Sequence, residues 1–349
     1  MMPTALIAWR RTPPPFLIGG AEVTQQLLAE QLAAAGWRVV YLGAHEPPWD
    51  GPGQLTDITT YLDTNDTPHE TVSGAVRYWW NGVDCIAVQQ TRIPSTLATL
   101  LTDLRPDVVF TSQEGAAEIA AATRAHALTT GICHSVSATG LGVLAGRPHV
   151  GLAVSEFALH RAGHPAGTRM ALWHPPFTQP SPGAVNTART GGPVLMVNPI
   201  PAKGSQLMHG LIQAMPEEHF TLVEGWWNTS AEFHRYPNVT YVPRVYDMAP
   251  LYRAHRLLLV PSVVEDAFPR VIIEAGLHGV PTIGTDRGGI PEAVGASGTV
   301  LPAEADAEKW AAAIRTTDHR GAGERARLDA ARYTRPVVPE LAALGLTPT

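Results

Sequence analysis

Short apolar runs alternate with helix-spaced apolar positions along most of the 349 residues. The segment 21–35 illustrates the helical pattern, because Val23, Leu27, Leu28 and Leu32 recur at the spacing of one helix face. The apolar runs have the length of buried strands, and they lie at residues 4–9, 38–42, 84–88, 106–111, 129–134, 150–155, 172–176, 194–197, 220–223, 239–242, 257–261 and 280–285. Strands that alternate with helices predict α/β domains with doubly wound parallel sheets.

The stretch 178–193 interrupts this alternation. It has no apolar periodicity and is dense in proline, glycine, serine and threonine, which is typical of an interdomain linker. A chain of 349 residues is also longer than one hydrophobic core usually supports. We therefore expect an N-terminal domain at 1–177, the linker, a second domain at 194–330 and a C-terminal tail at 331–349.

Residues 45–78 form a second unusual stretch, which is polar, rich in Pro, Gly, Asp and Thr, and too long for an ordinary connection. Trp49, Trp79 and Trp80 lie in or beside it. Aromatic rings on exposed loops can stack on sugar faces or apolar acceptors, but they also serve to pack a loop against its domain. The sequence leaves both roles open.

The most specific pattern lies at residues 261–294. Residues 270–279 have helical apolar spacing, and residues 280–285 suit a short buried strand. The pair Gly288-Gly289 then leads into another helix. A helix N-terminus behind paired glycines offers backbone amides and a positive dipole end to an anion.

Three carboxylates accompany this glycine turn. Glu265 and Asp266 precede the first helix, and Glu274 lies about two turns inside it. Carboxylates cannot hold a phosphate, but they accept hydrogen bonds from hydroxyls. Carboxylates that can accept hydrogen bonds from hydroxyls, next to a site for an anion, indicate a sugar nucleotide as ligand.

Asp266 and Glu274, eight residues apart, and the following GVPTIGTDRGGIPEAV resemble the donor-site signature of the retaining glycosyltransferases of family 4 (glycosyl transferases group 1). The alternative is a generic strand–helix unit of an α/β domain. The resemblance implies the GT-B fold, in which two Rossmann-like doubly wound parallel-sheet domains face a cleft. It further implies that the N-terminal domain binds the acceptor, that the second domain binds the donor, and that the tail packs back on the N-terminal domain.

The resemblance also implies roles for single residues. Glu274 would accept hydrogen bonds from the ribose hydroxyls, Asp266 would bind the hydroxyls of the transferred sugar, and His134 would contact that sugar near the anomeric centre. Lys203, in the turn NPIPAKG, would neutralise the leaving diphosphate. The other donor-binding residues expected are Gly19, Gly20, Asn198, Glu265, Phe268, Gly288, Gly289 and Ile290. For His134, Lys203 and the Gly19-Gly20 pair, a purely structural role stays open.

Metal-dependent transferases commonly use an Asp-x-Asp pair, and the sequence contains none. We therefore expect transfer without a metal or other cofactor. The chain departs from the family pattern at Asn198, where an arginine is usual, at Asp266, where a glutamate is usual, and at Pro269, where a glycine is usual. The same fold also leaves open a sugar-nucleotide 2-epimerase, and Asn198 and Pro269 leave open a non-catalytic sugar-nucleotide-binding protein. A dehydrogenase is disfavoured because no Gly-x-Gly-x-x-Gly follows the first strand.

Composition narrows the partners and the compartment. The net charge of −6 argues against a nucleic-acid partner and gives no indication of an electrostatic membrane anchor. Cys85 and Cys133 are too few for a disulfide framework, so we expect buried reduced thiols. We see no signal peptide and no membrane span, so we expect a cytoplasmic protein.

The sequence does not show whether the donor nucleotide is UDP, GDP or dTDP. It also does not show whether the acceptor is a small molecule, a glycan or a lipid-linked compound, and it does not give the oligomeric state.

Overall fold

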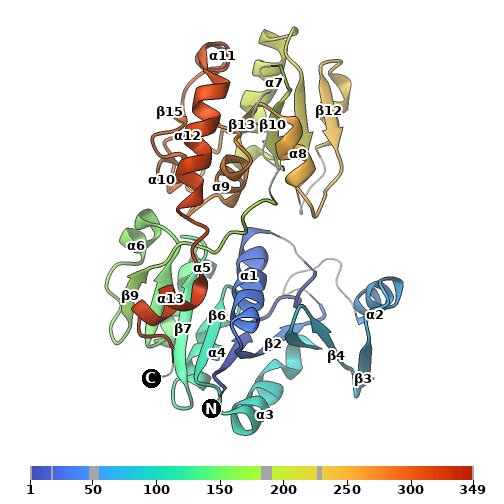
Figure 1. Ribbon diagram of the computed structural model, residues 1–349, viewed down its shortest axis with the longest axis vertical. Coiled ribbons are helices and arrows are strands. Elements are labelled where there is room, and N and C mark those ends of the chain that lie inside the picture. The colour runs from blue at the N-terminus through green and yellow to red at the C-terminus, as the bar shows by residue number, and fades with distance from the viewer. Residues whose placement is uncertain (1, 17–18, 47–54, 182–190, 226–229, 348–349) are drawn as a thin grey trace. The chain divides into compact units, whose positions relative to one another are not determined.

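The computed structural model describes residues 2–16, 19–46, 55–181, 191–225 and 230–347. The chain forms two compact units (Figure 1). The first unit comprises Met1–Pro176 and Arg335–Thr349, and the second comprises Phe177–Thr334. Most of the stretch predicted as a linker lies outside the described residues.

The described residues of the first unit form a nine-stranded sheet in the order β3-β4-β5-β2-β1-β6-β7-β8-β9. Seven strands are parallel, namely β1 (Thr4–Ala8), β2 (Arg38–Ala44), β5 (Val83–Val88), β6 (Val108–Ser112), β7 (Leu128–Cys133), β8 (Val150–Ala153) and β9 (Arg169–Leu172). The helices that connect them are α1 (Gly20–Ala34), α3 (Ile93–Leu104), α4 (Ala116–Thr123), α5 (Ala138–Gly142) and α6 (Glu156–Ala162), with 3-10 turns at Gln90–Arg92 and Val143–Gly146. The predicted alternation is therefore confirmed, although the last strand ends at Leu172 instead of beginning there.

The polar stretch 45–78 is more regular than the sequence indicated. It contains α2 (Leu55–Thr64), β3 (His69–Val72) and the start of β4 (Ala75–Trp80), and both strands run antiparallel at the edge of the sheet. Ser73 and Gly74 form the hairpin turn with positive φ angles of 50° and 77°. The signal missed in the sequence is the strict alternation in β4, in which buried Val76 and Tyr78 are separated by exposed Arg77.

The three tryptophans expected near this stretch have different surroundings. Trp49 lies outside the described residues. The ring of Trp79 is 62% exposed on the hairpin. Trp80 is half-buried, and its Nε1 donates a hydrogen bond to Glu30 Oε1 at 3.2 Å, so this ring packs the hairpin against α1.

In the second unit, the residues that the structure describes form a six-stranded parallel sheet in the order β12-β11-β10-β13-β14-β15. The strands are β10 (Val194–Val197), β11 (Phe220–Val223), β12 (Val239–Val242), β13 (Leu257–Val260), β14 (Thr282–Thr285) and β15 (Thr299–Leu301). The helices are α7 (Ser205–Ala214), α8 (Ala249–Ala254), α9 (Arg270–Leu277), α10 (Ile290–Val294), α11 (Ala307–Thr316) and α12 (His319–Ala331), with 3-10 turns at Pro201–Lys203 and Ala231–Arg235. This order is that of a doubly wound sheet, whose ligands lie beyond the carboxyl ends of the strands.

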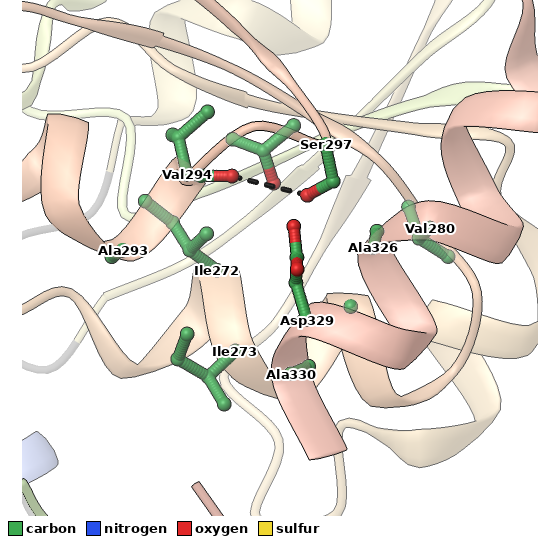
Figure 2. A pocket seen from close by; sticks show the side chains of 11 residues that line it. Ile272, Ile273, Val280, Ala293, Val294, Ser297, Ala326, Asp329 and Ala330 are labelled. Atoms are coloured by element: carbon green, nitrogen blue, oxygen red, sulfur yellow. Dashed lines mark hydrogen bonds between the residues drawn. The ribbon is translucent and has the colours of Figure 1, made fainter. Parts of the chain in front are cut away.

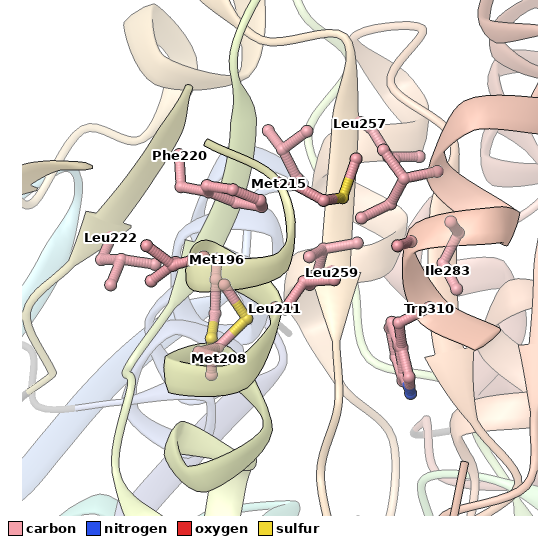
Figure 3. Packing of buried hydrophobic residues seen from close by; sticks show 14 of the residues in the cluster. Met196, Met208, Leu211, Met215, Phe220, Leu222, Leu257, Leu259, Ile283 and Trp310 are labelled. Carbon is pink, nitrogen blue, oxygen red and sulfur yellow. The ribbon is translucent and has the colours of Figure 1, made fainter. Parts of the chain in front are cut away.

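Apolar side chains from the strands and two helices fill the core of the second unit. Figure 3 shows Trp310 of α11 beside side chains from the sheet, and Met208 and Leu211 of α7 against β10 and β11. Trp310, Met208 and Phe220 are completely buried. This core fixes the strands whose ends position the candidate site.

The C-terminal segment belongs to the first unit. Val337–Ala343 forms α13, which packs against α1, and the Val337 amide donates to Gln31 Oε1 at 3.3 Å. The two cysteines, Cys85 and Cys133, are free and buried, as predicted. No helix built from the described residues is long and apolar enough to cross a membrane.

Candidate functional site

Three loops meet at the carboxyl ends of β10, β13 and β14 in the second unit. The Val263 amide donates to the Ala202 carbonyl at 3.1 Å, which joins the loop after β13 to the loop after β10. The Thr285 hydroxyl donates to the Ser262 carbonyl at 2.7 Å, which joins the end of β14 to the same loop. The predicted donor residues of this unit therefore lie on segments that are hydrogen-bonded to one another.

Lys203 and Asp266 form an ion pair between two of these loops. The distance from Lys203 Nζ to Asp266 Oδ2 is 2.5 Å, and the side chains are 31% and 22% exposed. Both groups are therefore accessible to a ligand while they are paired. The pair places a cation and a hydroxyl acceptor side by side, which is the combination a phosphorylated sugar requires.

Glycines allow these loops to approach closely. Gly204 follows Lys203 with φ of 93°, and a Cβ at this position would lie 2.1 Å from the Pro261 carbonyl oxygen. Gly288 has φ of 61°, and its Cβ would lie 2.4 Å from the Asp266 carbonyl oxygen. Only glycine fits at these two positions, because each combines a left-handed backbone with a backbone contact.

The Gly289 and Ile290 amides, which are expected to bind the donor, have hydrogen-bond partners within the chain. The Gly289 amide donates to the Asp266 carbonyl at 2.6 Å, and the Ile290 amide donates to the Arg287 carbonyl at 3.2 Å. Both amides thus donate to carbonyls of the chain, and their role toward a diphosphate stays a prediction. The helix behind them, Ile290–Val294, is also only five residues long. The paired glycines also let their loop pack closely against the backbone of Asp266 and Ala267.

Glu274 lies on α9 and is held at both carboxylate oxygens. The Tyr252 hydroxyl donates to Oε2 at 3.0 Å, and Arg270 Nε donates to Oε1 at 3.1 Å. Burial, followed by the nearby Glu274 charge, raises the pKa of Tyr252 well above its ordinary value, so the phenol stays a donor. Burial lowers the pKa of Arg270, although Glu274 opposes that change.

Phe268 lies in an aromatic cluster beside this carboxylate. Its ring packs against Phe177 and Tyr333 with centroid distances of 6.5 and 5.4 Å. Arg270 stacks over Phe177 at 4.1 Å from its ring centroid. The cluster packs around the guanidinium that binds Glu274, and the role of Phe268 toward a donor stays a prediction.

Asn198 and Glu265 complete the predicted set in this unit. Asn198 follows β10 with φ of 60°, and its Oδ1 is buried with no hydrogen-bond donor among the residues described. A Cβ on Gly225 would lie 2.0 Å from that oxygen, so the end of β11 closes over Asn198. Glu265 is exposed next to Asp266.

The first unit holds the remaining predicted residues. Gly19 precedes α1 and Gly20 is the first residue of this helix, while half-buried His134 directly follows β7. All three lie at carboxyl ends of strands or at the start of the helix that follows, as the resemblance implies. Their roles toward a ligand stay predictions.

An ion-pair network beside Gly19 and Gly20 was missed in the sequence. Arg11 Nη1 lies 2.5 Å from Glu22 Oε1, and Arg11 Nε lies 2.8 Å from Glu114 Oε2. Burial alone would lower the pKa of Arg11, but the hydrogen bonds and attraction of Glu114 and Glu22 raise it above its ordinary value. The one sequence signal was a charged residue soon after a buried strand, which does not reveal its partners.

A small internal space lies among described residues of the second unit (Figure 2). It has a volume of about 10 Å³ and is lined by residues of α9, α10 and α12, including Ile272, Val294 and Asp329. Ser297 closes one side and donates a hydrogen bond to the Val294 carbonyl at 3.1 Å. A space of this size holds at most about one water molecule, so it is not a ligand site.

Metal ligands do not gather in the described part of the chain. No group of three or more His, Cys, Asp or Glu side chains there could hold a metal ion.

The chain has two units with doubly wound sheets, and comparison with known proteins identifies the kind of domain and the fold. Residues 211–317 match the family model described as glycosyl transferases group 1, so the second unit carries a domain of that kind. The match includes Tyr252, Asp266, Glu274 and the paired glycines. No curated protein matches the sequence.

Solved glycosyltransferase structures share the fold over the whole chain. The chain is similar to sucrose-phosphate synthase from Thermosynechococcus elongatus, with 18% identity, a TM-score of 0.71, and 99% and 98% of the two chains covered. It is similar to Anabaena HepE in complex with UDP-glucose, with 19% identity, a TM-score of 0.70, and 98% of each chain covered. A glycosyltransferase from Rickettsia africae gives 16% identity, a TM-score of 0.69, and coverage of 99% and 97%. The chain therefore has the GT-B fold, as predicted.

Proposed function

We propose that the protein is a retaining glycosyltransferase that moves a sugar from a nucleoside-diphosphate sugar to an acceptor. The observation that carries this proposal is the 2.5 Å pair of Lys203 and Asp266 at the carboxyl ends of β10 and β13. A sugar nucleotide needs a cation for its diphosphate and an acceptor for its sugar hydroxyls, and this pair supplies both. The match of residues 211–317 to glycosyl transferases group 1 supports the same reaction class.

When the donor binds, Lys203 and Asp266 break their ion pair and each binds a part of the donor instead. Lys203 Nζ turns to the diphosphate, where negative charge grows as the bond to the sugar breaks. Asp266, released from the lysine, accepts hydrogen bonds from the transferred sugar. The resting pair keeps both charges compensated until the ligand replaces it.

Glu274 binds the ribose hydroxyls of the donor. Its carboxylate is fixed by Tyr252 and Arg270, so its rotamer is set before the nucleotide arrives. The second unit is thus the donor domain, and the first unit, with His134 and the Gly19-Gly20 turn, takes the acceptor and meets the sugar.

In this proposal a lysine neutralises the charge of the leaving diphosphate, and no metal is needed. Its support is the presence of Lys203 at the site and the lack of an Asp-x-Asp pair in the sequence. The leaving phosphate removes the proton of the acceptor hydroxyl on the same face of the sugar, which retains the anomeric configuration. UDP-glucose is the first donor to test, because HepE was solved with that compound.

The test is release of nucleoside diphosphate from UDP, GDP and dTDP sugars with a panel of small-molecule, glycan and lipid-linked acceptors. NMR of the product gives the anomeric configuration, and the metal requirement follows from assays with and without a chelator. Lys203→Met and Glu274→Ala should each lose most turnover while circular dichroism shows an intact fold. Full activity in both variants would contradict the site.

Two alternative functions would give different results in the same assays. Deuterium incorporation at the sugar carbon in heavy water would favour a 2-epimerase. Tight nucleotide binding without transfer to any acceptor would favour a binding protein.

A further inference from the structure

A second candidate site lies in the first unit, in a cavity of about 250 Å³ between α3 and α4. Both helices begin at the carboxyl edge of the sheet, since α3 follows β5 and α4 follows β6. The cavity runs along the two helices, from Ile93 to Thr102 on α3 and from Glu118 on α4 to His126 beyond it. It is about 25 times larger than the water-sized space in the second unit.

The walls of this cavity are mainly apolar. Ile93, Leu97 and Leu101 of α3 belong to one packed cluster with Ile119 of α4 and form the floor of this space, where each is at most 5% exposed. Ala98 and Ala122 lie at the open side, where their short side chains leave the space between the helices unfilled. An apolar cavity of this kind favours a hydrocarbon group over a polar one.

Arg10 supplies a cation at the carboxyl-edge end. The guanidinium lies against the start of α4, because a Cβ on Gly115 would be only 2.3 Å from Arg10 Nε. The Arg10 carbonyl accepts a hydrogen bond from Gln90 Nε2 at 2.6 Å, which fixes the backbone at this point. The Arg10 side chain thus lines the cavity at the end near the carboxyl edge of the sheet.

The adjacent arginines differ in how their charge is compensated. Arg11 is paired with Glu22 and Glu114. For Arg10, in contrast, the described residues provide no carboxylate within ion-pair distance and no acceptor for its buried Nε. A buried donor without an acceptor is unfavourable, so an anion at this end would improve the electrostatics of the fold.

The other polar side chains that line the cavity limit the charge that the anion can carry. Glu118 and His126 are exposed to solvent, so neither requires a ligand, and Glu118 adds a negative charge near Arg10. A single guanidinium beside a carboxylate suits a monoanion better than a doubly charged phosphate. A carboxylate also matches the two-pronged hydrogen-bonding geometry of arginine.

The volume of the cavity limits the length of the hydrocarbon chain that a ligand can place in it. An engineered apolar cavity of roughly 150 Å³ takes the six carbons of benzene, so this cavity has room for about ten carbons. It is too small for a protein helix or for part of a bilayer. We propose that the first unit binds a free medium-chain fatty acid, with the carboxylate at Arg10 and the chain along the space between α3 and α4, beside Ala98 and Ala122.

Calorimetric titration of the full-length protein with decanoate tests this site. Decanol removes the charge and acetate removes the chain, so each should bind at least about tenfold more weakly than decanoate. Arg10→Gln should weaken decanoate about tenfold and change decanol less than about twofold. Ala98→Leu and Ala122→Leu should weaken both ligands about tenfold, because leucine fills the cavity.

Ala121→Leu is the matched control, since Ala121 is exposed on the same helix and does not line the cavity. It should bind decanoate like the wild type. The proposal would be overturned if millimolar decanoate gave no heat of binding or if all four variants bound decanoate equally. Binding to phosphatidylglycerol vesicles but not to decanoate would also overturn it. Because UDP binding to the second unit is measured separately, failure here leaves the donor site untouched.

Discussion

The Tyr252 hydroxyl donates a hydrogen bond to Glu274 Oε2 at 3.0 Å from a position that is only 2% exposed. Arg270 Nε donates to the other carboxylate oxygen of the same residue. Both donors are buried, whereas the Glu274 side chain remains 26% exposed. The arrangement therefore presents a carboxylate whose orientation is fixed from behind and whose accessible side is open to a ligand.

Tyr252→Phe tests whether this orientation matters for nucleotide binding. The ring stays and only the hydroxyl is lost, so one donor to a charged acceptor disappears. Such a hydrogen bond contributes about 1.5–3 kcal/mol, and we expect UDP to bind about tenfold or more weakly. Titration calorimetry with UDP and with its 2′- and 3′-deoxyribose analogues measures the effect.

The deoxy analogues separate positioning from general loss of structure. If Tyr252 positions Glu274 for the ribose, the variant should lose discrimination between UDP and the analogue that lacks the recognised hydroxyl. Tyr61→Phe, in the first unit, is the control and should bind UDP normally. Unchanged discrimination in Tyr252→Phe would show that Glu274 does not read the ribose through this contact.

Lys203→Met should lower turnover about 100-fold or more, because a group that stabilises developing charge in the transition state typically contributes that much. Methionine keeps the length and apolar stem of lysine but removes the charge. The chain offers a matched control, since Lys309 is the only other lysine in the sequence and is exposed on α11. Lys309→Met should keep wild-type turnover, and a similar loss in both variants would point to an effect unrelated to the site.

Gly289→Ala should destabilise the second unit. A Cβ on Gly289 would lie 2.0 Å from the Ala267 carbonyl oxygen, so the backbone must move. We expect a loss of about 2 kcal/mol or more in the free energy of unfolding, measured by denaturant titration. Gly210→Ala is the control, because its Cβ would lie 3.5 Å from Ala307 inside helix α7, where alanine is favoured. Equal stability of the two variants would contradict the close packing of the glycine loop.

The alternation of strands and helices could be predicted because buried parallel strands are short, continuous apolar runs. The order Val194–Val197, turn, helix, Phe220–Val223 in the second unit follows directly from that signal. The edge hairpin of the first unit was missed because its composition is polar and only alternate positions of β4 are buried. Polarity alone therefore does not distinguish a loop from an edge strand.

The candidate site was predicted to a different extent in each of its parts. Loop residues such as Lys203 and Asp266 could be named because the glycine and proline pattern around them is specific, but their ion pair spans 63 residues and has no sequence signal. Tyr252 could not be found for the same reason, since it lies 22 residues from Glu274. Arg270 was accessible to prediction, because residues four apart on a helix face one another. The direction of the Gly289 and Ile290 amides depends on loop packing, which residue types alone do not specify.

His319 gives the second unit a predicted sensitivity to acid. It lies at the start of α12, and its Nε2 accepts a hydrogen bond from Arg256 Nε at 3.2 Å. Burial and then the Arg256 charge lower the pKa of His319 from its ordinary value of 6.5. The unfolded chain therefore binds this proton more readily than the folded one, so stability is fully present above about pH 6.5 and decreases as the pH falls below that value.

His319→Gln keeps a hydrogen-bond acceptor for Arg256 but cannot be protonated, so it should lose less stability between pH 7.5 and pH 5.5 than the wild type. Because His319 is only half-buried, we expect a difference of about 1–3 °C in the fall of the melting temperature. Burial also lowers the pKa values of His149 and His209, so part of the acid sensitivity should remain in the variant. His160→Gln, on the exposed side of α6, is the control and should follow the wild type at both pH values. An identical acid response in His319→Gln and the wild type would show that the Arg256 contact does not depend on the neutral imidazole.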